Sequence, residues 1–154
     1  MHSRLFQLSL EPIEEDDLID DFDLQYNFIG QIADYARDSV DKEDDLEWLE
    51  SVIGKHGAVI DHKKKTICFE EGFKLSYFKK KFDSFKERVS DLTLETFAGI
   101  SKGSSMDLYV VEKLLEDKFD FYIYIDYPQC LDDFVRDLEE GKTYYFGNII
   151  DYHF

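Results

Sequence analysis

The clearest secondary-structure signal in the chain is the segment FDFYIYID, residues 119–126. Apolar side chains occupy every second position of this segment, at Phe119, Phe121, Ile123 and Ile125. Such an alternation is typical of a β-strand, because successive side chains of a strand point to opposite faces of the sheet. Proline cannot donate a backbone hydrogen bond to a neighbouring strand, so we expect the strand to end before Pro128.

Strand patterns also occur elsewhere, at residues 4–10, 58–60, 66–69 and 143–154. The first of these places Phe6, Leu8 and Leu10 on one face, as a half-buried strand does. The second and third flank a polar turn at residues 61–65, which predicts a β-hairpin. In the fourth, a run rich in Tyr, Phe and Ile contains Gly147-Asn148, which predicts a β-bulge or a tight turn.

Apolar residues recur at helical spacing in five segments, at residues 24–40, 42–53, 75–92, 106–117 and 131–138. Asp23 is placed to cap the first of these helices, Gly54 to end the second, and Ser105 to cap the fourth. The third has the most regular stripe, with steps of three and four residues, at Leu75, Phe78, Phe82, Phe85, Val89 and Leu92. Because an amphipathic helix normally turns its apolar face to the core, we expect this stripe to be buried. Its flanking lysines are then placed to pair with the acidic N-terminal third.

The order of these elements mixes hairpins with helical crossovers and predicts an α+β fold. We expect a mainly antiparallel or mixed sheet of about five strands packed against four to five helices. A length of 154 residues is that of one domain, and no linker divides the chain. Residues 1–154 are therefore predicted to form a single domain, with an acidic loop or short helix around residues 11–23.

The charge of the chain is strongly acidic and unevenly distributed. Eighteen basic and thirty-five acidic residues give a formal net charge of −17 and a pI near 4.4. Residues 1–50 carry sixteen acids and three bases, whereas residues 51–100 carry seven acids and ten bases. This balance argues against direct binding to nucleic acid or to an anionic membrane. This uneven distribution favours a polarised surface that binds a basic protein. The alternative is that the acidic residues only form the solvent-exposed faces of amphipathic helices.

Cysteine usage and hydropathy indicate an intracellular protein. Two cysteines, Cys68 and Cys130, are too few for a disulfide scaffold, and no apolar leader opens the chain. The longest apolar run is far shorter than the roughly 20 residues that span a bilayer. We therefore expect a cytoplasmic protein that does not bind membranes.

The motifs of common cofactor and metal sites are not met. Gly141-Lys142-Thr143 has only the ending of a phosphate-binding loop, and the segment after it is strand-like rather than helical. The four histidines are scattered, and no cysteine pair has the spacing of a zinc site. His56 and His62 could meet at the base of the hairpin, but we interpret both as exposed polar loop residues. The acidic run at residues 14–23 has no glycine for the sharp turn of a calcium loop. We predict no cofactor and no metal.

Acidic residues are the main candidates for a functional site. Acids four residues apart on a helix project from points roughly 5–6 Å apart, so that an acidic helix face can imitate a row of phosphates. The residues predicted to bind a partner are Asp16, Asp17, Asp20, Asp21, Glu43, Asp44, Glu47, Glu50, Asp132, Asp133 and Asp137. In its acidic composition the chain is similar to DNA-mimic inhibitors of restriction or CRISPR nucleases. That similarity implies a non-enzymatic inhibitor of a basic, nucleic-acid-handling protein.

Two other functional classes are also compatible with the sequence. The first is a small intracellular enzyme with a site assembled from dispersed residues, for which Cys130, Asp126 and a histidine are the candidates. A deep pocket that joins these groups would favour the enzyme. The second is a structural subunit, an antitoxin or an immunity-type protein. The aromatic C-terminus can serve either as sheet core or as the seam of a homodimer, since aromatic residues are enriched in both.

Overall fold

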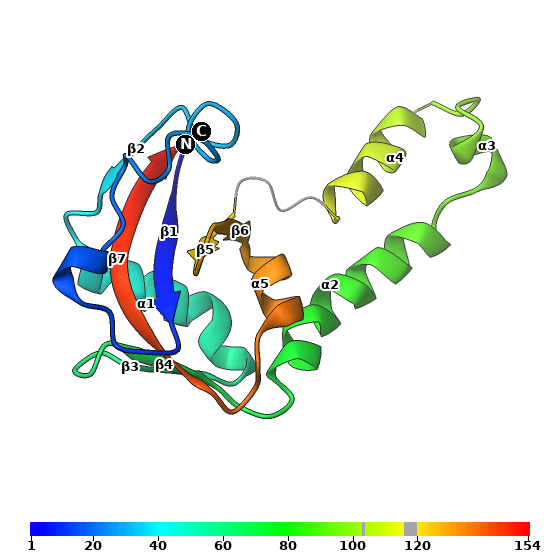
Figure 1. Ribbon diagram of the computed structural model, residues 1–154. Helices are drawn as coiled ribbons and strands as arrows, with labels where there is room; N and C mark the ends of the chain where they lie inside the picture. The colour runs from blue at the N-terminus through cyan, green and yellow to red at the C-terminus, as the bar shows by residue number, and fades with distance from the viewer. Residues whose placement is uncertain (103, 116–119) are drawn as a thin grey trace. The chain divides into compact units, whose positions relative to one another are not determined.

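The computed structural model describes residues 1–102, 104–115 and 120–154 (Figure 1). Two compact units make up the chain, and each is described by itself. The sheet unit contains residues 1–74 and 117–154, and the helical unit contains residues 75–116. Both helices and a mixed sheet are present, which confirms the predicted α+β class.

The sheet unit is built on a mixed sheet in which seven strands are described. These are β1 (His2–Ser9), β2 (Tyr35–Asp38), β3 (Ala58–Asp61), β4 (Thr66–Phe69), β5 (Tyr122–Tyr124), β6 (Pro128–Cys130) and β7 (Thr143–His153). Their order is β3-β4-β7-β1-β5-β6, and β2 also pairs with β7. β1 and β5 are parallel and the other pairs are antiparallel. β3 and β4 form the predicted hairpin, and β2 and β6 were not predicted as strands.

β1 and β7 form the centre of the sheet and lie side by side in Figure 1. Their register shifts once, because Phe6 pairs with Ile149 whereas Leu8 pairs with Phe146. β7 therefore carries one extra residue at Gly147-Asn148, which confirms the predicted bulge. A Cβ atom on Gly147 would lie 2.3 Å from Oε1 of Gln7, so any larger residue there would force the Gln7 side chain to move.

Both faces of the central strands are covered. Leu5 belongs to a core cluster with Leu24 and Phe28, which come from the segment after the acidic loop. The next residue, Phe6, points to the opposite face and contacts Phe121. Phe121 in turn contacts Trp48 of α1 (Lys42–Ile53), with ring centroids 4.7 Å apart. β1 is thus buried on both sides rather than half-buried, because α1 covers one face and residues 19–33 cover the other.

The helices of the sheet unit largely follow the sequence prediction. α1 spans Lys42–Ile53 and buries Leu46, Leu49 and Ile53, as predicted. The chain continues in a short 3-10 helix, η2 (Gly54–His56), and the left-handed turn is made by Gly57 at φ 103°. α5 (Leu131–Asp137) buries Phe134 and Val135, also as predicted. A second short 3-10 helix, η1 (Glu15–Asp17), lies within the acidic loop.

The predicted helix at residues 24–40 is wrong. Tight turns follow Leu24, Gly30 adopts a φ of 84°, and the chain then forms β2 against β7. Asp23 caps no helix, because its carboxylate accepts a hydrogen bond from the backbone of Asp20. Val40, expected on the buried face, is 97% exposed. The free edge of β7 supplies backbone partners for β2, and this tertiary pairing overrides the local helical spacing.

The segment FDFYIYID also differs from its prediction. Phe119 lies outside the described residues, and β5 covers only Tyr122–Tyr124. Phe121 and Tyr122 are both buried, because the two faces of the sheet are covered at this point as well. Pro128 does not follow a simple strand end but begins β6, the last strand in the order. A proline fits there because an edge strand needs no donor on its outer side.

The helical unit contains most of α2 (Phe73–Ser90), together with α3 (Leu94–Phe97) and α4 (Ser104–Lys113). The helix predicted from the regular stripe is confirmed, but the stripe is not buried. Leu75, Phe82 and Val89 are 81%, 57% and 41% exposed. Helical spacing shows that one face is apolar, and it does not show what covers that face. The predicted cap at Ser105 concerns a side chain that is not described, and α4 already begins at Ser104.

Candidate partner-binding surface

The acidic loop is held against the sheet by the side chain of Gln7. Its amide nitrogen donates to the backbone oxygen of Asp17 at 2.7 Å, and its Oε1 accepts from the backbone N–H of Ile19 at 3.1 Å. Ile19 is buried, whereas Asp16 and Asp17 are exposed. Gln7 therefore fixes the backbone of the loop and leaves its carboxylates in solvent.

The turn that follows is fixed by its own carboxylates. Oδ1 of Asp20 accepts from the backbone N–H of Phe22 at 2.8 Å, and Asp23 accepts from Asp20 at 2.9 Å. Such side-chain to backbone bonds are typical of aspartate-initiated turns. Asp20 and Asp21 remain exposed. This acidic segment is thus an ordered surface as well as a charged one.

Asn148, in the bulge of β7, joins the acidic loop to the start of α1. Its Nδ2 donates to the backbone oxygen of Ile19 at 2.7 Å and to Asp38 at 2.8 Å. Its Oδ1 accepts from Nζ of Lys42, the first residue of α1, at 2.6 Å. One buried side chain therefore joins the two main acidic segments, although its contacts in them, Ile19 and Lys42, lie 23 residues apart in the sequence.

The outer face of α1 carries the row of acids that the sequence predicted. Glu43, Asp44 and Glu47 are exposed, and Glu50 is partly exposed. Glu43 and Glu47 are four residues apart and therefore neighbours on the helix surface. No basic residue lies in the last turn of the helix. Glu43 and Asp44 lie in its first turn, where the helix dipole favours negative charge.

A buried ion network fixes α1 on the sheet. Arg4 of β1 contacts Asp45 of α1 at 2.5 Å and Asp151 of β7 at 2.6 Å. Burial raises the pKa of Asp151, but the hydrogen bond from His2 and the Arg4 and Arg37 guanidinium groups outweigh this effect, so that its pKa lies below the ordinary value. Asp45 is buried, whereas the nearby acids Asp44 and Glu47 are exposed, so a buried ion pair fixes the helix that carries the acidic row.

His62, in the turn of the β3–β4 hairpin, contacts two acids of the α1 row. Its ring nitrogens lie 2.5 Å from Glu43 and 3.2 Å from Glu50. Hydrogen bonds to Glu50 and then Glu43 raise the pKa of His62 above its ordinary value, against the opposing effect of burial. His62 was interpreted from sequence as a polar loop residue. No local pattern reveals that the hairpin returns it to α1.

Trp48 is a further residue of this surface that sequence reasoning missed. Its ring packs against Phe121 on one side, and the guanidinium carbon of Arg4 lies 5.5 Å from the ring centroid. The side chain is still 42% exposed and lies one helical turn from Asp44. A half-exposed tryptophan within a charged surface has the character of an interface anchor.

The acids of α5 form a separate group. Asp133 and Asp137 are exposed, and Asp133 pairs with Arg136 at 2.5 Å. Asp132 is only 3% exposed, so the prediction that it binds a partner is wrong. Asp132 lies three residues before the buried Val135 and therefore shares its inward face. No described contact joins these acids to those of α1.

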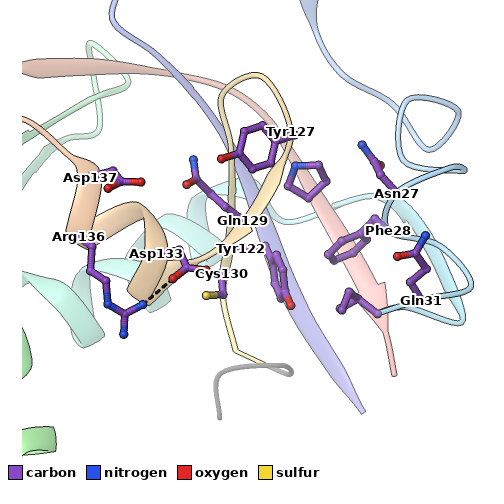
Figure 2. A pocket seen from close by; sticks show the side chains of 12 residues that line it. Asn27, Phe28, Gln31, Tyr122, Tyr127, Gln129, Cys130, Asp133, Arg136 and Asp137 are labelled. Atoms are coloured by element: carbon purple, nitrogen blue, oxygen red, sulfur yellow. Dashed lines mark hydrogen bonds and ion pairs between the residues drawn. The ribbon is translucent and has the colours of Figure 1, made fainter. Parts of the chain in front are cut away.

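A cleft of about 600 Å³ lies between α5, β6 and the segment around Phe28 (Figure 2). Figure 2 shows Cys130 beside Tyr122 in its centre, with Asp133 and Arg136 on one side and Gln31 on the other. Asp126 does not line it, and the described lining contains no histidine. The cleft therefore does not assemble the cysteine, aspartate and histidine that the enzyme hypothesis requires.

Two kinds of feature are absent from the described part of the chain. It contains no cluster of three or more histidine, cysteine or carboxylate side chains arranged to hold a metal ion. Within the same residues, no helix has the length and apolarity needed to cross a membrane. Cys68 and Cys130 are not joined in a disulfide.

The chain was compared with protein-family models, with curated proteins and with solved structures, and none of the three comparisons gave a match.

Proposed function

We propose that this chain binds a basic protein partner through the carboxylates of α1 and the acidic loop, and that the partner handles nucleic acid. The observation that supports this most directly is the side chain of Asn148, which ties both acidic segments to one bulge. The two segments that carry the carboxylates are thereby anchored before a partner arrives. Binding then costs less conformational entropy than it would with a flexible acidic tail.

The distribution of charge supports the same proposal. Residues 75–116 contain seven acids and seven bases, so the whole net charge of −17 belongs to the sheet unit. A concentrated field of one sign accelerates association with a partner of opposite sign and repels nucleic acid itself. A partner with a nucleic-acid-binding surface is basic over an area of suitable size, and a bound acidic protein would block that surface. Nucleic-acid mimicry of the anti-restriction or anti-CRISPR type is the specific form of this proposal.

The first experiment is an affinity capture from the lysate of the native host with the full chain as bait. Two variants change the charge by the same amount at different places. Asp44→Lys/Glu47→Lys alters the acidic row without touching the partners of His62, and Asp91→Lys/Glu112→Lys alters exposed acids of the helical unit. We expect a basic, nucleic-acid-binding protein to be retained at low salt. The first variant should weaken its binding at least about tenfold and the second less than about twofold.

Two further measurements make the result specific. Duplex DNA should displace the captured protein, since both ligands would occupy one basic surface. Trp48 is the only tryptophan of the chain, so 5-fluorotryptophan labelling gives one ¹⁹F resonance beside the acidic row. Partner binding should shift that resonance. Equal binding by both charge variants, or binding that does not weaken in high salt, would contradict the proposal.

A further inference from the structure

α2 carries a complete heptad pattern. Leu75, Phe82 and Val89 are seven residues apart, and Phe78 and Phe85 follow the first two of them after three residues. In the heptad notation abcdefg these are positions a and d, which form the seam between two helices of a coiled coil. The strict spacing of 3.5 residues describes a narrow stripe suited to one partner helix.

The a positions of this stripe are open to solvent. Leu75 is 81% exposed, Phe82 57% and Val89 41%. Exposed apolar side chains at consecutive a positions mark a surface that a partner covers. The ammonium group of Lys86 lies 5.3 Å from the ring centroid of Phe82, so a cation already shields part of the seam.

The residues that flank the seam carry charge of one sign. The e positions are Lys79 and Lys86, and the g positions are Lys81 and Arg88. In coiled coils the e and g residues choose the partner, because they face the corresponding residues of the other helix. Four cations at these positions are complementary to glutamate or aspartate. Lys79 pairs with Asp83 on the solvent side of the same helix, at 2.7 Å, a weak exposed contact that a partner carboxylate can replace.

From this arrangement we infer that α2 is the docking site for an amphipathic helix of another protein, with apolar a and d positions and acidic e and g positions. This site is separate from the acidic surface of the sheet unit. It takes a partner of opposite charge, and it does not depend on the function proposed above.

A second copy of this chain is a poor occupant. Two α2 helices would place cations against cations in either orientation, because g faces e in parallel pairs and like positions face each other in antiparallel pairs. The acidic helix of this chain, α1, cannot serve either, since Leu46, Leu49 and Ile53 of its apolar face are buried within the sheet unit. An anionic membrane is disfavoured by the narrow stripe, because a helix that lies on a membrane needs a wide apolar face.

The test uses the full chain and two synthetic helices of three heptads. Both peptides carry leucine at a and d; one has glutamate at e and g, and the other has lysine there. We expect fluorescence anisotropy to show binding of the acidic peptide and at least about tenfold weaker binding of the basic one. Phe82→Glu should weaken binding of the acidic peptide at least about tenfold, because it places a charge in the seam.

A matched pair of variants separates specific flanking contacts from general attraction. Lys86→Glu changes an e position, and Lys80→Glu makes the same change at position f, on the far side of the helix. The first should weaken binding of the acidic peptide about fivefold and the second less than about twofold. The double variant Lys79→Glu/Lys86→Glu leaves two anions and two cations beside the seam, so it should lose the preference for the acidic peptide. Circular dichroism of each variant confirms that its helix content is unchanged.

Three results would overturn the inference. The first is equal weakening by Lys86→Glu and Lys80→Glu, which indicates nonspecific attraction. The second is a dimer in sedimentation that Phe82→Glu dissolves, which assigns the seam to a second copy. The third is binding to phosphatidylcholine–phosphatidylserine vesicles without binding to the acidic peptide, which assigns it to a membrane.

Discussion

The sheet unit and the helical unit use the same kinds of residue in opposite ways. The sheet unit carries the entire net charge and buries large aromatic residues such as Phe6, Phe28 and Tyr152 between two covered faces. The helical unit is neutral and exposes apolar residues such as Leu94 and Phe97, at 79% and 71%. The first unit stabilises itself by burial and presents charge, and the second presents apolar surface. The two partners that we propose differ accordingly: a basic protein for the sheet unit and an acidic amphipathic helix for α2.

The largest expected difference between the units comes from one substitution made in each. Leu49→Ala in α1 removes a side chain that is only 1% exposed, and it should lower the free energy of unfolding by about 2–5 kcal/mol. Leu94→Ala in α3 should change it by less than about 0.5 kcal/mol. Urea unfolding of both variants measures this contrast. A large cost at Leu94 would show that the helical unit has a covered core.

Removing an ion pair should also cost more free energy of unfolding in the sheet unit than in the helical unit. Arg4→Met leaves Asp45 and Asp151 buried without their shared guanidinium, which should cost about 3 kcal/mol. Lys79→Met removes an exposed pair with Asp83 and should cost at most about 0.5 kcal/mol. Thermal unfolding of the two variants at low and high salt tests this. Similar costs for the two would contradict the assignment of the Arg4 network as the base of α1.

Gly147→Ala tests how the acidic loop is anchored. The added Cβ would lie 2.3 Å from Gln7 Oε1, and the resulting shift should cost about 1–3 kcal/mol. The amide of Ile19, which donates to Gln7, should then exchange with deuterium faster. Gly54→Ala is the control, because Gly54 has a helical φ of −59° and the change should stay below about 1 kcal/mol. Unchanged exchange at Ile19 would show that Gln7 does not hold the loop.

The smallest expected effect is a dependence on pH near neutrality. All four histidines belong to the sheet unit, and the pKa of His62 is raised by Glu50 and Glu43. Because the pKa of His62 is raised in the folded state, protonation of its ring stabilises the fold. This stabilisation is fully present below the ordinary pKa of 6.5 and is lost as the pH rises through the folded-state pKa. His62→Gln should therefore cost more stability at pH 5.5 than at pH 9. An equal cost at both would mean that the contact is not ionic.

Elements with strong local signals were predictable. α1 has the bounds that its apolar spacing predicts, and the β3–β4 hairpin is recognisable from its polar turn. β2 was missed because its pairing depends on an edge of β7 more than a hundred residues away. Asp132 was misplaced because charge alone does not report which side of a short helix faces the core. His62 and Asn148 were missed as site residues because their contacts join segments distant in sequence.

The α+β class, the acidic charge and the heptad stripe of α2 follow from composition and from spacings of a few residues, so they are visible in the sequence. Contacts between distant segments settle which stripes are covered, which acids are exposed, and which acidic segments share an anchor. Local periodicity specifies that a face is apolar or charged. Only packing between distant segments specifies whether that face meets the core, another segment or solvent.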